Sequence, residues 1–150
     1  MDRKELLKKA QEAKAGAYAP YSRFRVGAAL LGKSGRVYTG ANVENASYSV
    51  TCCAERVALF KAVTEGEREF DAIAVTSDSD SLTWPCGVCR QALSEFGLDM
   101  DVLGSNNVLE YQSVKLKALR ECVRGWMRRP ASLSSGWATT SMPGSAGTCM

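Results

Sequence analysis

The sequence predicts an α/β fold in which helices pack on the faces of one mixed β-sheet. The main evidence is the order of the expected elements, which runs helix, strand, strand, helix, strand, helix, strand, strand, helix. The 150 residues are enough for one domain with a sizeable core. The apolar share of 45% and the charged share of 23% are ordinary for a globular protein.

Hydrophobic periodicity and turn residues place each element. Apolar residues at helical spacing predict helices over residues 3–18, 53–63, 86–96 and 115–127. Apolar runs between turn residues predict strands over residues 24–31, 36–40, 70–76, 100–103 and 108–114. The turn Gly32-Lys33-Ser34-Gly35 predicts that the first two strands form a hairpin.

The end of the chain differs in composition from the rest. Residues 1–114 carry 13 Lys and Arg against 15 Asp and Glu, whereas residues 115–150 carry 6 against 1. Of the last 20 residues, 14 are Ser, Thr, Gly or Ala and none is charged, so this segment cannot bury enough apolar surface to order itself. We expect one domain over residues 1–128 and a flexible tail over residues 129–150.

Composition also excludes some locations and partners. No apolar run is long enough to span a bilayer, and the N-terminus lacks the apolar core of a signal peptide, so we expect a cytoplasmic protein with no membrane partner. The net charge of −2 over residues 1–114 lacks the uniform basic footprint of a nucleic-acid binder, and we expect no nucleic-acid partner.

Cysteine is the most informative residue type, because the chain has six cysteines and no histidine. Cys53 and the pair Cys86 and Cys89 fall at the starts of two predicted helices, where the helix dipole favours thiolates. Three thiolates suit zinc and leave a fourth position for water, which favours an open, catalytic site. A closed structural zinc and a redox Cys-x-x-Cys pair are the alternatives. The other three cysteines, Cys52, Cys122 and Cys149, are interpreted as bystanders.

Two charged residues beside Cys53 suit such a site. Glu55 is close enough to face the metal without binding it, so it can take a proton from a zinc-bound water and deliver it elsewhere. Zinc with three thiolates carries a formal charge of −1, which Arg56 can offset by donating hydrogen bonds to the ligand sulfurs.

Four motifs resemble those of a known family, the zinc-dependent nucleoside and nucleobase deaminases, and most closely its small homotetrameric cytidine deaminases. The resemblance covers roughly residues 5–105. The motifs are Ala19-Pro20-Tyr21-Ser22-x-Phe24-x-Val26-Gly27-Ala28-Ala29-Leu30, Gly40-x-Asn42-x-Glu44-Asn45-Ala46-x-Tyr48-Ser49, Cys53-Ala54-Glu55-Arg56-x-Ala58 and Pro85-Cys86-Gly87-x-Cys89-Arg90-Gln91.

The resemblance implies a three-layer α/β/α sandwich with a mixed five-stranded sheet, one zinc ion per subunit and a homotetramer. It implies that zinc hydroxide attacks C4 of cytidine or 2′-deoxycytidine while Glu55 protonates N3 and then the departing amine, in pyrimidine salvage. In the same family pattern, the substrate would be bound by Phe24, which stacks on the base, by Asn42 and Glu44, which bind the ribose, and by the Ala54 backbone. Tyr48 would lie near a subunit contact.

Three other functions remain open at this point. They are deamination of another small molecule such as an aminonucleoside antibiotic, editing of nucleic acid, and a zinc module without enzymatic activity. The intact Asn42-x-Glu44 pair favours a plain ribose, and the body lacks an obvious basic, aromatic-lined groove for nucleic acid.

The C-terminal region departs from the family. Its Leu-Leu-Pro-x-x-Phe segment, whose aromatic reaches a neighbouring subunit's site, is absent from residues 116–126. A reading-frame change near residues 115–120 is one hypothesis, because charge and composition shift abruptly there. A genuine variant in which Trp126 replaces that aromatic is the alternative.

Overall fold

The computed structural model describes residues 1–123, with side chains described as far as residue 119. The helices are α1 (Arg3–Ala13), α2 (Ala54–Thr64) and α3 (Gly87–Ser94), with short 3-10 helices η1 (Lys14–Gly16), η2 (Tyr48–Val50) and η3 (Leu116–Val123). The strands are β1 (Val26–Gly32), β2 (Val37–Ala41), β3 (Phe70–Ser77), β4 (Asp101–Ser105) and β5 (Tyr111–Lys115). The order of the elements is the one that the sequence predicts.

The five strands form one mixed sheet in the order β2-β1-β3-β4-β5. β1 is antiparallel to both β2 and β3, β3 is parallel to β4, and β4 is antiparallel to β5. The β1–β2 hairpin turns at Gly35, whose φ of 85° lies in the left-handed region that glycine adopts without steric cost. The predicted mixed five-stranded sheet is confirmed.

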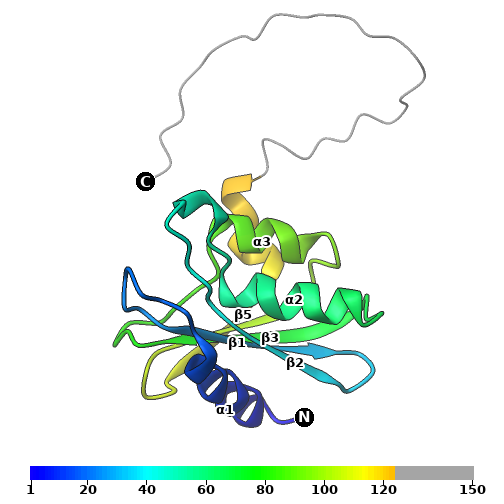
Figure 1. Ribbon diagram of the computed structural model, residues 1–150. Coiled ribbons are helices and arrows are strands. Elements are labelled where there is room, and N and C mark those ends of the chain that lie inside the picture. The colour runs from blue at the N-terminus through cyan, green and yellow to red at the C-terminus, as the bar shows by residue number, and fades with distance from the viewer. Residues whose placement is uncertain (124–150) are drawn as a thin grey trace, which may run out of the picture.

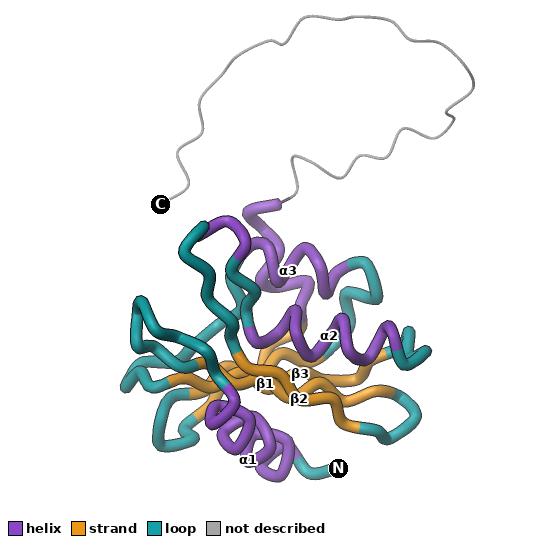
Figure 2. The backbone as a smooth tube through the Cα atoms, in the orientation of Figure 1, coloured by secondary structure: helices purple, strands orange, loops and turns teal. Residues whose placement is uncertain are grey.

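Helices cover both faces of the sheet, as Figure 1 shows, with α1 on one face and α2 and α3 on the other. The same three layers are visible in the tube view of Figure 2. The α/β/α sandwich is therefore confirmed. Every helix in residues 1–123 is too short or too polar to cross a membrane.

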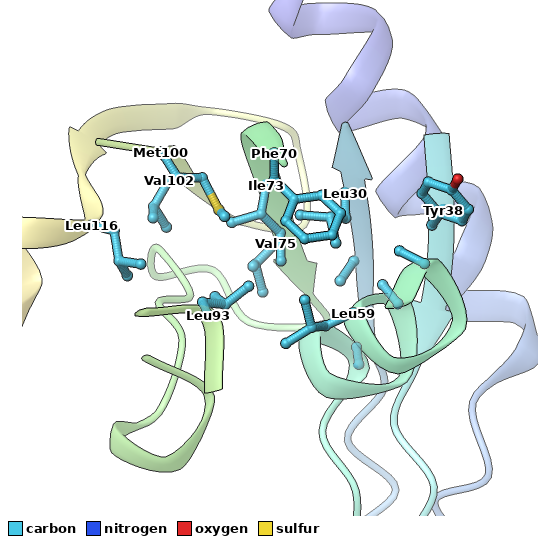
Figure 3. Packing of buried hydrophobic residues seen from close by; sticks show 14 residues of the cluster. Leu30, Tyr38, Leu59, Phe70, Ile73, Val75, Leu93, Met100, Val102 and Leu116 are labelled. Carbon is cyan, nitrogen blue, oxygen red and sulfur yellow. The ribbon is translucent and has the colours of Figure 1, made fainter. Parts of the chain in front are cut away.

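The larger hydrophobic core lies between the sheet and the α2–α3 layer. Figure 3 shows Leu59 of α2 and Leu93 of α3 gathered with strand residues such as Val75. A second cluster joins α1 to the opposite face through Leu6, Leu7 and Ala10. The sheet thus lies between α1 and the layer formed by α2 and α3. Because α2 and α3 share a layer, their first turns lie over the same face of the sheet.

A close approach of backbones fixes the position of α2. A Cβ atom added at Gly40 of β2 would lie 2.5 Å from Ala54 O and 2.5 Å from Ala58 N. Only glycine permits this spacing, so the first turn of α2 sits directly against β2.

Two predicted helices differ from the observed ones. The first ends at Ala13 rather than at residue 18, because the following chain is drawn into other contacts: Lys14 Nζ donates to Ser77 O, and Tyr18 N donates to Asn42 O. The last is the 3-10 helix η3 over Leu116–Val123, and residues 124–127 of that prediction lie outside the described residues. So do the end of the predicted domain, the predicted tail over residues 129–150, Trp126 and Cys149.

Candidate functional site

Three cysteine thiols meet where α2 and α3 begin. Cys53 is the N-cap residue of α2, Cys86 is the N-cap residue of α3, and Cys89 lies in the first turn of α3. Their Sγ atoms all lie within 4.8 Å of one another, and the Cys53 and Cys86 sulfurs are 3.8 Å apart. Three thiolate donors at this spacing fit a tetrahedral zinc ion with one further coordination position. The cluster predicted from the sequence is thus positioned to bind a metal ion.

The electrostatics of the cluster favour negatively charged sulfur. Hydrogen bonds from the Cys89 thiol and from Arg56 lower the pKa of Cys53 to about 5, and the first of these raises the pKa of Cys89 as the donor. The positive ends of two helix dipoles act in the same direction. A zinc ion in this position would displace the proton that Cys53 and Cys89 share.

Arg56 contacts the cluster directly. Its Nη2 atom donates to Cys53 Sγ at 3.7 Å and to Thr51 O at 3.0 Å. The guanidinium is thereby anchored to the segment before α2, with its positive charge beside a thiolate. This geometry fits the predicted compensation of the excess negative charge of a three-thiolate zinc site.

Glu55 is buried in the first turn of α2, with only 3% of its surface exposed. Removal of the carboxyl group from water raises its pKa to about 7. A carboxyl group with a pKa near neutrality can both accept and return a proton, which is what a general acid–base residue requires.

A cavity of about 300 Å³ lies in front of the cluster. It brings the predicted residues Phe24, Asn42 and Glu44 together with Cys53, Cys86 and Glu55. The residues lining the cavity are Ser22, Phe24, Val26, Asn42, Glu44, Tyr48, Thr51, Cys53, Glu55, Thr83, Trp84 and Cys86. The volume is at the lower end of the range for small-molecule sites. Ala54 does not line it with a side chain and is fully buried beneath.

Asn42 and Glu44 shape the loop that presents Phe24. The Asn42 side chain accepts a hydrogen bond from Val26 N at 2.9 Å and donates one to Phe24 O at 2.9 Å. Glu44 accepts hydrogen bonds from the backbone N–H of Ser22 at 3.1 Å and from its hydroxyl group. Phe24, held in this loop, is 40% exposed and lines the cavity.

Several lining residues were not predicted. Thr83 and Trp84 precede the Pro85-Cys86 motif, and their only signal in the sequence is that proximity. Ser22 lies within the motif that begins at Ala19, but the sequence predicts no role for it. Two larger cavities, of about 440 and 460 Å³, contain none of the predicted site residues.

The sequence and the fold of this chain are similar to those of known proteins. Residues 1–105 match the family described as the cytidine and deoxycytidylate deaminase zinc-binding region. The chain belongs to this family. The matched part of this deaminase-family chain includes all three clustered cysteines, Glu55 and the whole cavity lining, and it ends with β4.

Individual relatives agree with the family. A cytidine deaminase of Halalkalibacterium halodurans is 60% identical over 95 residues, which are 63% of this chain and 72% of the relative. A crystal structure of cytidine deaminase from Burkholderia pseudomallei matches with a TM-score of 0.77 and 43% identity, covering 79% of this chain and 96% of that one. The crystal structure from Mycobacterium tuberculosis matches with a TM-score of 0.70 and 41% identity, covering 81% and 95%. This deaminase-family member is therefore an enzyme with a zinc-binding domain.

Proposed function

We propose that this protein hydrolyses cytidine and 2′-deoxycytidine to uridine and 2′-deoxyuridine with release of ammonia. The observation that carries the proposal is that one cavity contains thiols of the metal-binding cluster, a buried carboxyl group and an exposed phenylalanine ring. The similar proteins from Halalkalibacterium halodurans and Burkholderia pseudomallei are named cytidine deaminases, which supports the choice of substrate. Pyrimidine salvage in the cytoplasm is the setting that this reaction suits.

The proton transfers are assigned to Glu55. Cys53, Cys86 and Cys89 would hold zinc, which when bound supplies a water whose pKa falls from about 15.7 towards 7. The Glu55 carboxylate would take a proton from the attacking water and deliver it to N3 of the pyrimidine as oxygen adds to C4. It would then take the proton of the new hydroxyl group at C4 and pass it to the departing amine, so that the C4–N bond breaks as the C4 carbonyl forms. The positive charge of Arg56 acts to lower the pKa of Glu55 and so favours the basic form that begins this sequence.

Substrate binding is assigned to other residues that line the cavity. The exposed ring of Phe24 offers a stacking surface for the base. The Glu44 carboxylate, held by Ser22, offers acceptors for ribose hydroxyl groups, and Asn42 has donor and acceptor capacity beyond its two backbone hydrogen bonds. The Ala54 backbone contributes to recognition of the base.

A homotetramer is part of the proposal. Exposed apolar side chains gather in residues 18–24 and 43–50, beside the cavity, and Tyr48 is 88% exposed. The other large members are Tyr18, Tyr21, Val43 and Val50. Several exposed large apolar side chains in two neighbouring segments suit an interface between subunits. Sedimentation equilibrium of the purified protein tests this assembly, and a monomer at micromolar concentration would contradict it.

The substitution Glu55→Gln tests the mechanism. It keeps the shape of the side chain but removes its ability to transfer protons, so we expect kcat for cytidine to fall by a factor of about 10² to 10⁴. Zinc content should remain near one ion per chain, because Glu55 is not one of the three clustered thiols. Ammonia release and elemental analysis of the same sample measure both quantities.

The matched control is Glu95→Gln, an exposed glutamate just after α3. This variant should retain the turnover of the unmodified protein. Full activity of Glu55→Gln would remove Glu55 from the mechanism, whereas no cytidine turnover by the zinc-loaded wild-type protein would remove the proposed substrate.

A further inference from the structure

One wall of the cavity is formed by a residue to which the mechanism gives no task. Trp84 lines the cavity and is two residues from the zinc-ligand candidate Cys86. Its side chain is partly buried and packs against the larger hydrophobic core, as does that of Val26, another lining residue. A large aromatic ring therefore stands between the core and the space near the metal-binding thiols.

The backbone that carries this ring is held in place on both sides. Thr83 N donates to Ser105 O at 3.0 Å in an isolated bridge to the end of β4, and the hydroxyl groups of Thr83 and Ser77 are 2.6 Å apart. Pro85 follows, which restricts Trp84 to extended backbone conformations. The wall thus has little freedom to withdraw from an incoming ligand.

Gly104 of β4 provides the space that the ring occupies. A Cβ atom added at Gly104 would lie 2.7 Å from two ring carbons of Trp84, Cδ2 and Cε3, and 2.9 Å from Thr83 O. Gly104 itself does not line the cavity, whereas Trp84 does. The ring is therefore seated between strand β4 and the cavity, and its depth in the cavity depends on the absence of a side chain at residue 104.

We propose that Trp84, seated on Gly104, determines substrate specificity by limiting the size of the substituent at C5 of the pyrimidine. The inference rests on the proposed cytidine deaminase function. It assigns Trp84 a steric role, distinct from the stacking role of Phe24. No covalent step involves the indole.

The choice of C5 follows from the direction in which each element enters the cavity. In the proposed reaction Glu55 of α2 serves N3, which adjoins C4 on one side of the ring. C5 adjoins C4 on the other side. Trp84 enters from the segment before α3, a different element from the one that carries Glu55, and lies beside Cys86. Because the N3 side of a base whose C4 is at the reaction centre is assigned to Glu55, the wall that Trp84 forms beside the thiols is assigned to the C5 edge.

The experiment compares two substrates in four proteins. The ratio of kcat/KM for 5-iodocytidine to kcat/KM for cytidine is measured for the wild type and for Trp84→Ala, Trp84→Phe and Gly104→Ala. A general loss of folding or of zinc lowers both values together, so the ratio isolates the shape of the pocket. Zinc content and circular dichroism are recorded for each protein.

We expect the ratio to rise about tenfold or more in Trp84→Ala, because a pocket discriminates small size differences by factors of about 10 to 200. Trp84→Phe should give an intermediate rise. Gly104→Ala should lower the ratio, since its methyl group forces the ring towards the cavity.

Two results separate failure of this inference from failure of the proposed function. If the zinc-loaded wild type does not deaminate cytidine, the function itself is wrong. If cytidine is deaminated but the ratio is unchanged in Trp84→Phe and Gly104→Ala, the steric role of Trp84 is overturned. These two milder variants decide the question even if Trp84→Ala fails to fold.

Discussion

Asn42 and Glu44 are two residues apart in the sequence but differ in their surroundings. Asn42 is buried and its side chain bonds to the backbone groups of Val26 and Phe24, whereas Glu44 is half-buried and its carboxylate accepts hydrogen bonds from Ser22. The sequence predicts the same ribose-binding role for both. It could not distinguish them, because the backbone contacts of Asn42 depend on how β1 lies beside the loop after β2.

Truncation of each side chain should therefore have a different consequence. Asn42→Ala leaves the partly buried N–H of Val26 and carbonyl of Phe24 without these partners, so we expect a loss of about 1–3 kcal/mol in the free energy of unfolding. Glu44→Ala should cost no more than about 0.5 kcal/mol, because the exposed Ser22 groups that it leaves can bond to water instead, but it should raise KM for cytidine. Urea unfolding and steady-state kinetics measure the two effects. Equal destabilisation by both variants would show that the hydrogen bonds of the Asn42 side chain do not stabilise the fold.

The order of the elements could be predicted from hydrophobic periodicity. The ends of the elements could not be predicted where contacts with distant residues determine them. The first helix has apolar residues at helical spacing as far as residue 17, yet it ends at Ala13. Lys14 is buried there, bonded to Ser77 O, Asp78 and the Asn107 side chain. These partners lie more than sixty residues away, so local spacing does not report them.

The contact between β2 and α2 gives a prediction at the level of elements. Gly40→Ala places a methyl group 2.5 Å from backbone atoms of Ala54 and Ala58, so α2 must move away from the sheet. Because α2 carries Glu55 and begins after Cys53, we expect weaker zinc binding, lower turnover and a loss of about 1–3 kcal/mol in stability. Chelator competition, ammonia release and urea unfolding measure these quantities.

Gly16→Ala is the matched control for this substitution. A Cβ atom at Gly16 would have no neighbour within 4 Å, and its backbone lies outside the left-handed region. Stability should stay the same or rise by up to about 1 kcal/mol through the unfolded chain. If Gly40→Ala behaves like Gly16→Ala, the close approach does not position α2.

Across the whole molecule, the metal cluster was the most predictable feature and the cavity wall was the least. Cysteine spacing and the absence of histidine restrict the ligands to a few thiols, so Cys53, Cys86 and Cys89 follow from sequence alone. The role of Trp84 depends on Gly104, twenty residues later and on a different element. A resemblance to a family identifies the residues that its members share. The contact between Trp84 and Gly104 can be recognised only once the elements are packed together in the structure.

Zinc joins two helices of the same layer, so its removal should weaken the whole domain. A ligand that binds only the folded state stabilises it by about 4 kcal/mol at 1,000 times its Kd. For a chain of this size, 1 kcal/mol corresponds to about 2–4 °C in Tm, so we expect excess chelator to lower Tm by about 10 °C. Differential scanning calorimetry with and without chelator measures the shift.

The adjacent cysteines supply a matched pair of variants for this prediction. Cys53→Ser should abolish the dependence of Tm on zinc, whereas Cys52→Ser, outside the cluster, should retain it. A Tm of the zinc-loaded wild type that is insensitive to chelator, or a Cys52→Ser variant that loses the dependence, would mean that the three thiols do not link α2 to α3 through a metal ion.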